Sequence, residues 1–156
     1  MNGISQLSRF GLMYDLLLYP KHLRAATLLV QKFPEQPFVL DHMGKPKIAE
    51  GLLSPWRENL RELASAQNVL CKFSGMVTEA RWNQWKPAEF IRYFESVVEA
   101  FAPERLMIGS DWPVCLLSGD YAATMQLTID YVQQFSPEAQ SGILGENCAR
   151  FYGINP

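Results

Sequence analysis

Cysteine, charge bias and long apolar runs are all scarce in this sequence of 156 residues. Its 3 cysteines lie far apart, with no Cys-x-x-Cys or Cys-x-x-His pair, which excludes a disulfide scaffold and a cysteine zinc finger. We expect three buried thiols, at Cys71, Cys115 and Cys148. No apolar run approaches the ~20 residues of a membrane span, and the first ten residues lack the pattern of a signal peptide. We therefore expect a cytoplasmic protein.

Composition and charge point to an ordinary folded domain. The formal net charge is only −2, which gives no electrostatic reason to expect a nucleic-acid or membrane partner. Hydrophobic residues make up 48% of the chain, enough for a sizeable core, so we expect a single domain over residues 1–156. No Gly-x-Gly-x-x-Gly follows an apolar run, so a Rossmann-type nucleotide site is not indicated.

Apolar runs alternate with segments of helical periodicity. The runs predict strands at residues 12–18, 38–40, 69–74 and 105–109. The periodic segments predict helices over residues 21–33, after Pro55, over 87–101, over 122–132 and over 136–153. Two local details accompany this prediction: the run 12–18 suits a strand buried on both faces, and Ser54 suits an N-cap. Ala122, Met125, Ile129 and Val132 mark the helix over residues 122–132.

The order of elements predicts an α/β fold with a parallel sheet, because strands separated by helices pair through right-handed crossovers. Two architectures fit this order. One is a small open doubly wound sheet, and the other is half of a (β/α)8 barrel.

Polar residues follow each predicted strand at the end where parallel sheets place functional groups. We expect a histidine, carboxylates, a lysine and a hydroxyl to converge on one rim. They are Asp15 and Tyr19, Asp41 and His42, Lys72 and Ser74, and Ser110, Asp111 and Trp112.

Structural explanations exist for several of these residues and for His22. His42 can be a hydrogen-bonded turn residue, Asp111 can cap a loop, and Lys72 can extend from its strand to the rim while its aliphatic stem stays buried. Ser74 and Gly75 can form a turn, backbone donors can satisfy Asp15, and His22 can lie on the surface.

The chemistry that such a rim could support is hydrolysis. Asp111 could accept a proton from water as a general base, and His42 or Lys72 could polarise a carbonyl or stabilise an oxyanion. Alternatively, His42 and Asp111 could hold part of a divalent metal site, which normally needs at least three protein ligands.

Two segments make the sequence recognisable. Residues 38–46, FVLDHMGKP, and 106–113, LMIGSDWP, resemble the signature strands of the amidohydrolase-2 family. Residues 72–75, KFSG, and the ending NCARFYG at 147–153 fit the same family. The chain is most similar to its sugar-lactone hydrolase branch, the L-fuconolactonase and L-rhamnonolactonase type.

The resemblance implies a (β/α)8 barrel hydrolase that opens a lactone ring. It implies that Asp111 is the general base, that His42 contacts substrate or metal, and that Tyr19, Lys72 and Trp112 line a substrate pocket. A single zinc ion held by His42 and Asp111, or no metal at all, are both compatible with it.

Length sets the chain apart from a complete barrel, which takes roughly 250 residues. The four βα units match strands five to eight, and the family's first-strand His-x-His is absent. We expect a partial barrel, part of a longer protein, that is a poor catalyst alone. Its unpaired edges and exposed apolar inner face would favour self-association or a homodimer. The alternative function is an inactive remnant that serves only as an interaction or oligomerisation module.

Overall fold

The computed structural model describes residues 3–154, and its centre is one sheet of four parallel strands. The strands are β1 (Tyr14–Leu16), β2 (Phe38–Leu40), β3 (Val69–Phe73) and β4 (Leu106–Ile108). They lie side by side in chain order, and Val39 is in register with Asp15 on one side and Leu70 on the other. This sequential order lacks the reversal of a doubly wound sheet, so it matches four consecutive βα units of a barrel.

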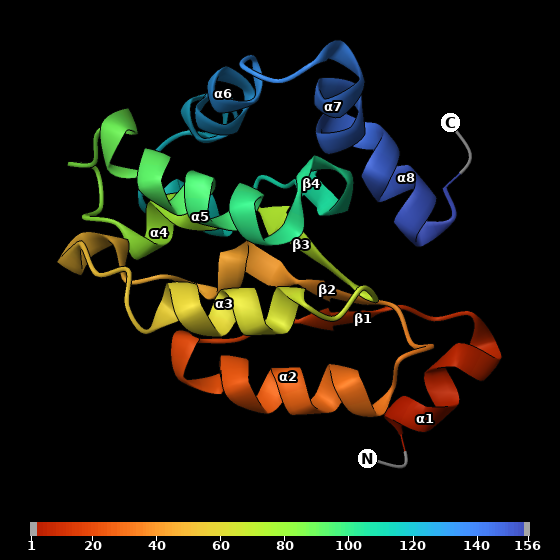
Figure 1. Ribbon diagram of the computed structural model, residues 1–156. Coiled ribbons are helices and arrows are strands. Elements are labelled where there is room, and N and C mark those ends of the chain that lie inside the picture. Colours follow the sequence, from red (N-terminus) through yellow and green to blue (C-terminus); the bar gives the residue numbers. More distant parts are fainter. Residues whose placement is uncertain (1–2, 155–156) are drawn as a thin grey trace.

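Helices follow the strands in the predicted order (Figure 1). The helices are α1 (Ile4–Leu7), α2 (Leu23–Lys32), α3 (Trp56–Ala64), α4 (Met76–Glu79), α5 (Ile91–Phe101), α6 (Tyr121–Val132), α7 (Pro137–Ser141) and α8 (Asn147–Tyr152). A π-helical segment, Gly142–Glu146, joins the last two. Short 3-10 turns lie at Ser8–Phe10, Pro20–His22, Asp41–Gly44, Ile48–Glu50, Pro87–Glu89, Pro103–Arg105 and Val114–Leu117.

One face of the sheet packs against the helices that connect the strands, and we call it the outer face. Its side chains include Phe38, Cys71 and Phe73, none of which is exposed. The helix predicted after Pro55 is confirmed as α3, and its residues Trp56, Leu60, Leu63 and Ala64 are all buried against this face. Burial of this apolar area is the main source of stability for the fold.

The opposite, inner face corresponds to the interior of a closed barrel. We expected its apolar residues to be exposed, but Val39 and Met107 are fully buried. Helix α8 covers them with Phe151, and Tyr152 packs beside it. The amide of Asn147 anchors this helix by donating to the carbonyl oxygens of Pro103 and Leu106, at 2.9 and 2.7 Å.

Two local predictions are wrong. The run 12–18 forms only the short edge strand β1, and Leu12 and Leu17 are 52% and 62% exposed because no further strand covers that edge. Ser54 caps nothing, since α3 begins at Trp56 and Pro55 occupies the N-cap position.

The helix predicted over residues 122–132 is present as α6. Its buried residues are Thr124, Leu127, Thr128 and Val132. Of the four residues that marked this helix in the sequence, only Val132 is buried. The hydroxyl of Thr124 is satisfied within the helix by the carbonyl oxygen of Asp120, which lets a polar side chain face the core.

The three cysteines, all expected to be buried, differ in burial. Cys71 and Cys115 are buried free thiols, but Cys148 is only half-buried because it lies at the edge of the cluster under α8. Across residues 3–154, no helix combines the length and apolar character needed to cross a lipid bilayer.

Candidate active site

The segment after β2 has an unusual backbone that presents His42 at the rim. His42, Met43 and Lys45 all have φ near +53°, and Gly44 between them has φ of 69°. Left-handed backbone is costly for residues with side chains and persists only where surrounding contacts fix it. One such contact comes from the Trp56 indole, which donates to the carbonyl oxygen of Met43 at 2.8 Å.

His42 lies between a hydroxyl and a carboxylate. Its Nδ1 is 2.8 Å from the Ser74 hydroxyl, and its Nε2 is 3.5 Å from Oδ1 of Asp111. The side chains of His42 and Asp111 are 15% and 11% exposed. This arrangement favours the tautomer in which Nε2–H faces Asp111 while Nδ1 accepts from Ser74.

The position of the imidazole requires glycine at residue 75. Gly75 has φ of 65°, and a Cβ built there would lie only 2.7 Å from the Cβ and Cγ of His42. The backbone of Gly75 therefore forms the wall against which the ring lies.

Burial governs the charge of His42. It lowers the pKa of the imidazole below its ordinary value of 6.5, against the opposing effects of Asp111 and Asp41. The neutral ring is therefore favoured at neutral pH. A neutral ring can donate one hydrogen bond and accept another, or it can bind a metal.

Asp111 is also held in left-handed backbone, with φ of 57°. Its Oδ2 is buried and has no hydrogen-bond partner. A buried carboxylate oxygen without a donor is costly, and it suits an atom that receives a proton or binds a water or a cation.

The rim offers few side chains that could bind the predicted metal ion. Within residues 3–154, no group of three or more His, Cys, Asp or Glu side chains could hold an ion. His42 and Asp111 supply two donors, whereas a catalytic zinc site normally has three protein ligands. The described residues therefore do not by themselves form a catalytic zinc site.

Lys72 points into the inner face below this rim. Its ammonium is 2.6 Å from Oδ2 of Asp15 and 2.9 Å from Oδ1 of Asp41. Asp15 also accepts from the Tyr152 hydroxyl, at 3.0 Å to each carboxylate oxygen. The expectation that backbone donors satisfy Asp15 is wrong, because side chains of β3 and α8 reach it across the open face.

The remaining predicted residues lie at the periphery. Trp112 follows Asp111 directly and is 64% exposed. Tyr19 is also exposed, and its ring centroid is 5.9 Å from the Lys45 ammonium. His22 is on the surface as expected, and its Nδ1 accepts from the backbone N–H of Tyr19.

Reasoning from sequence placed Asp41 and Ser74 at the rim but assigned neither of them a partner. It interpreted Gly75 only as part of a turn and gave Tyr152 no role. Nothing in the local sequence connects Tyr152 to residues more than a hundred positions earlier.

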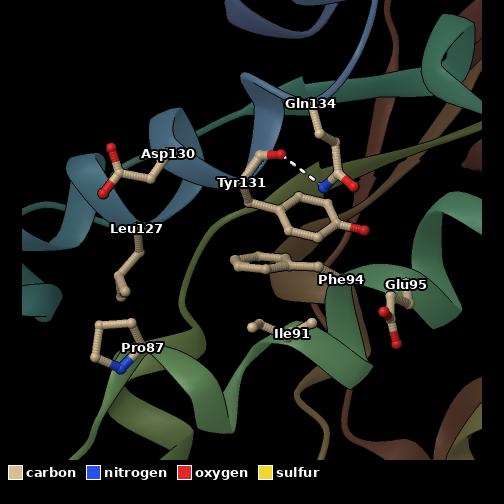
Figure 2. Close-up of a pocket in the computed structure, with 8 residues that line it drawn as sticks. All are labelled: Pro87, Ile91, Phe94, Glu95, Leu127, Asp130, Tyr131 and Gln134. Carbon is tan, nitrogen blue, oxygen red and sulfur yellow. Dashed lines mark hydrogen bonds between the residues drawn. The ribbon is translucent and has the colours of Figure 1, made fainter.

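A hollow lies away from the rim, in the groove between α5 and α6 (Figure 2). It has a volume of about 400 Å³. Phe94 and Tyr131 stack along it with ring centroids 4.7 Å apart. Its lining contains neither histidine nor cysteine, and its carboxylates, Glu95 and Asp130, lie at the margins. The convergence of polar groups therefore favours the rim as the functional site.

Comparison with known proteins identifies the family. The model of the amidohydrolase family matches residues 4–154. This chain belongs to the amidohydrolase family. The resemblance identified from the sequence is thereby confirmed, and the family is one of hydrolases.

Similar proteins include lactone hydrolases. The L-fucono-1,5-lactonase of Burkholderia multivorans is 36% identical over 162 residues, covering 97% of this chain and 55% of that protein. The 4-sulfomuconolactone hydrolase of Rhizobium radiobacter is 28% identical, covering 77% of this chain and 40% of that protein.

A solved structure of an amidohydrolase has the same fold as this chain. An amidohydrolase from Burkholderia multivorans with bound zinc superimposes with a TM-score of 0.92 at 36% identity, covering 99% of this chain and 57% of that one. The chain thus spans about half the length of the relatives it matches, and its fold is that of four βα units of a TIM-type barrel.

Proposed function

We propose that this chain carries the Asp–His part of a lactone hydrolase site and that its substrate is a sugar lactone. The observation that carries the proposal is the pairing of His42 with Asp111, whose Oδ2 is buried without a partner. Similarity to an L-fucono-1,5-lactonase along almost the whole chain supports it.

In the proposed reaction, Asp111 accepts a proton from a water molecule as its oxygen attacks the lactone carbonyl. The Nε2–H of neutral His42 donates to the carbonyl oxygen as negative charge develops there. The bond between the carbonyl carbon and the ring oxygen then breaks. The ring oxygen takes the proton from Asp111, so that lactone and water become one hydroxy acid.

Local charge favours an uncharged lactone. The two lysines whose charges act on His42 are already paired: Lys45 lies 2.9 Å from Glu79, and Lys72 is held by two carboxylates. With Asp111 ionised, this part of the rim repels a substrate that bears a carboxylate or sulfonate. A polyhydroxylated neutral ring fits it better.

A zinc ion at the same rim remains part of this proposal. A related amidohydrolase has been solved with zinc bound, and His42 and Asp111 are residue types that bind it. The described residues alone provide too few ligands, so any further ligand would come from outside them.

A chimera tests the proposal. Residues 3–154 would replace the matching part of the Burkholderia multivorans lactonase, and a pH-stat would follow hydrolysis of a neutral 1,5-sugar lactone. We expect turnover of ~1 s⁻¹ or more from the chimera, within the usual enzyme range, and near-background rates from the chain alone.

The matched variant is Asp111→Asn, which keeps the shape of the side chain and removes the base. It should lower turnover of the chimera by at least ~10²-fold, the contribution expected of a general base. A folded chimera whose rate is unaffected by Asp111→Asn would refute the assignment. Preference for an anionic muconolactone would refute the proposed substrate class.

The exposed side chains along β1 support a second candidate function, that of an association module. Leu12, Leu17 and Tyr19 are all exposed beside this unpaired edge, and such edges favour pairing with another chain. Analytical ultracentrifugation of the chain alone would test this. A concentration-dependent dimer would support a homodimer, and a monomer at all concentrations would exclude self-association.

A further inference from the structure

The inner face carries a charged cluster that the proposed reaction does not use. Its members are Asp15 from β1, Asp41 after β2, Lys72 from β3 and Tyr152 from α8. The lysine bridges the two carboxylates at 2.6 and 2.9 Å, and the tyrosine hydroxyl lies 3.0 Å from both oxygens of Asp15. Three strands and the last helix therefore meet at one set of polar contacts.

Asp41 is placed where it could compete with Asp111. It directly precedes His42, its charge acts on the imidazole as that of Asp111 does, and its side chain is only 14% exposed. A carboxylate this deeply buried needs a cationic or hydrogen-bonding partner. Lys72 supplies that partner as an ion pair, with its ammonium 2.9 Å from Oδ1 of Asp41. Asp41 is thereby occupied, and Asp111 is the carboxylate that faces Nε2.

Lys72 is in turn held by α8. Its ammonium is 5.4 Å from the ring centroid of Tyr152, a distance at which a cation interacts favourably with an aromatic face. The tyrosine hydroxyl fixes Asp15, the second carboxylate on the lysine. The anchoring of α8 beneath β4 by Asn147 therefore reaches the segment that carries His42.

We propose that Lys72 and Tyr152 are positioning residues that secure Asp41 and so leave Asp111 as the carboxylate partner of His42. The proposal rests on the proposed function only in treating His42 and Asp111 as the working pair. It assigns to α8 a part in the site, in addition to its role as an apolar cover of the inner face.

Histidine nitrogen spectroscopy tests this without measuring a reaction rate. The chain has 2 histidines, so selective ¹⁵N labelling gives two ring systems, and exposed His22 is an internal reference. At a fixed pH of about 8, the His42 ring should be neutral, because burial lowers its pKa below the ordinary value of 6.5. We expect His42 in the wild-type chain to show protonated Nε2 and an Nδ1 that accepts a hydrogen bond.

Four variants and two controls complete the experiment. Lys72→Met should shift the ring signals of His42 and leave those of His22 unchanged, and Lys72→Arg should restore the wild-type signals because the charge is kept. Tyr152→Phe and Asp15→Asn should shift His42 in the same direction by a smaller amount. The controls are Lys47→Met, which removes the lysine of an exposed ion pair, and Tyr121→Phe, which removes the hydroxyl of an exposed tyrosine.

The expected results distinguish a positioning role of Lys72 and Tyr152 from a general loss of structure. The positioning role is wrong if Lys72→Met and Tyr152→Phe move His42 no more than the two controls do. If Lys72→Met instead unfolds the chain and shifts both histidines, the test depends on the two milder variants. Lys72→Arg retains the positive charge, and Tyr152→Phe retains the aromatic ring. Failure of the lactonase assay leaves this result intact, and an unchanged His42 spectrum leaves the lactonase assay intact.

Discussion

The two faces of this sheet are built from alternating residues of the same four strands, yet they differ in chemistry. In β3, Cys71 and Phe73 point to the outer face, where helices cover them, and Lys72 between them points to the inner face among carboxylates. Alternation along a strand makes this separation possible, because successive side chains project to opposite sides. The outer face can therefore supply stability while the inner face and its rim carry strained backbone and polar groups.

The largest effect that would test this division is on the outer face. Phe73 is fully buried, with ring centroids 5.0 Å from Phe94 and 6.2 Å from Tyr131. Phe73→Ala should lower the free energy of unfolding by ~3–5 kcal/mol, the usual loss for a core phenylalanine. Urea denaturation measures it.

The control for that variant is Phe10→Ala, since Phe10 is 74% exposed. A surface change of this kind should alter stability by no more than ~0.5 kcal/mol. Equal losses from the two variants would show that the outer face does not dominate stability.

A smaller effect is expected at the wall of the site. In Gly75→Ala the new methyl group would meet His42 at 2.7 Å, in a backbone conformation that alanine rarely adopts. We expect a loss of ~1–3 kcal/mol in unfolding free energy, the range for a strained backbone position, together with displacement of the imidazole. Gly11→Ala is the matched control.

Gly11 has nearly the same φ, 64°, with nothing within 4 Å of a built Cβ. The difference between the two glycine variants therefore isolates the contact with His42 from the backbone strain that both share. Identical losses in urea denaturation would contradict the tight packing of His42 against residue 75.

Sequence reasoning was sufficient where information was local. Apolar runs and helical periodicity predicted the four βα units, and polar residues at strand ends predicted that His42 and Asp111 would lie together. It failed where a contact joins distant segments. The pairing of Tyr152 with Asp15 spans 137 positions, and neither residue type nor spacing indicates it. The cover that α8 provides for Val39 was missed for the same reason, since the sequence pattern shows that a residue is apolar but not which element buries it.

Removing the imidazole should affect the reaction more than the fold. His42→Ala deletes a side chain that contacts Ser74 and Asp111 at the rim, outside the main apolar core. We expect a stability change below ~2 kcal/mol, within the usual range for point variants, and reduced lactone hydrolysis in the chimera. Calorimetry and the pH-stat assay measure the two effects. A variant that does not fold would mean that His42 serves mainly as a structural residue.

The smallest predicted effect concerns tyrosine ionisation in the helical layer over the outer face. Burial raises the pKa of Tyr131 from 10 to about 12, where its ring stacks on Phe94 (Figure 2). Because the pKa is higher in the folded state, this contribution to stability is fully present below pH 10 and is lost as pH rises through about 12. Tyr131→Phe should therefore flatten the alkaline decline in the urea midpoint. The change should stay below ~1 kcal/mol, because the ring is partly exposed and solvent screens the effect.

Tyr152, whose pKa is also raised to about 12, remains in that variant and leaves part of the decline in place. The control is Tyr121→Phe, which removes the hydroxyl of an exposed tyrosine. Superimposable pH curves for Tyr131→Phe and Tyr121→Phe would show that burial of Tyr131 does not contribute to alkaline sensitivity.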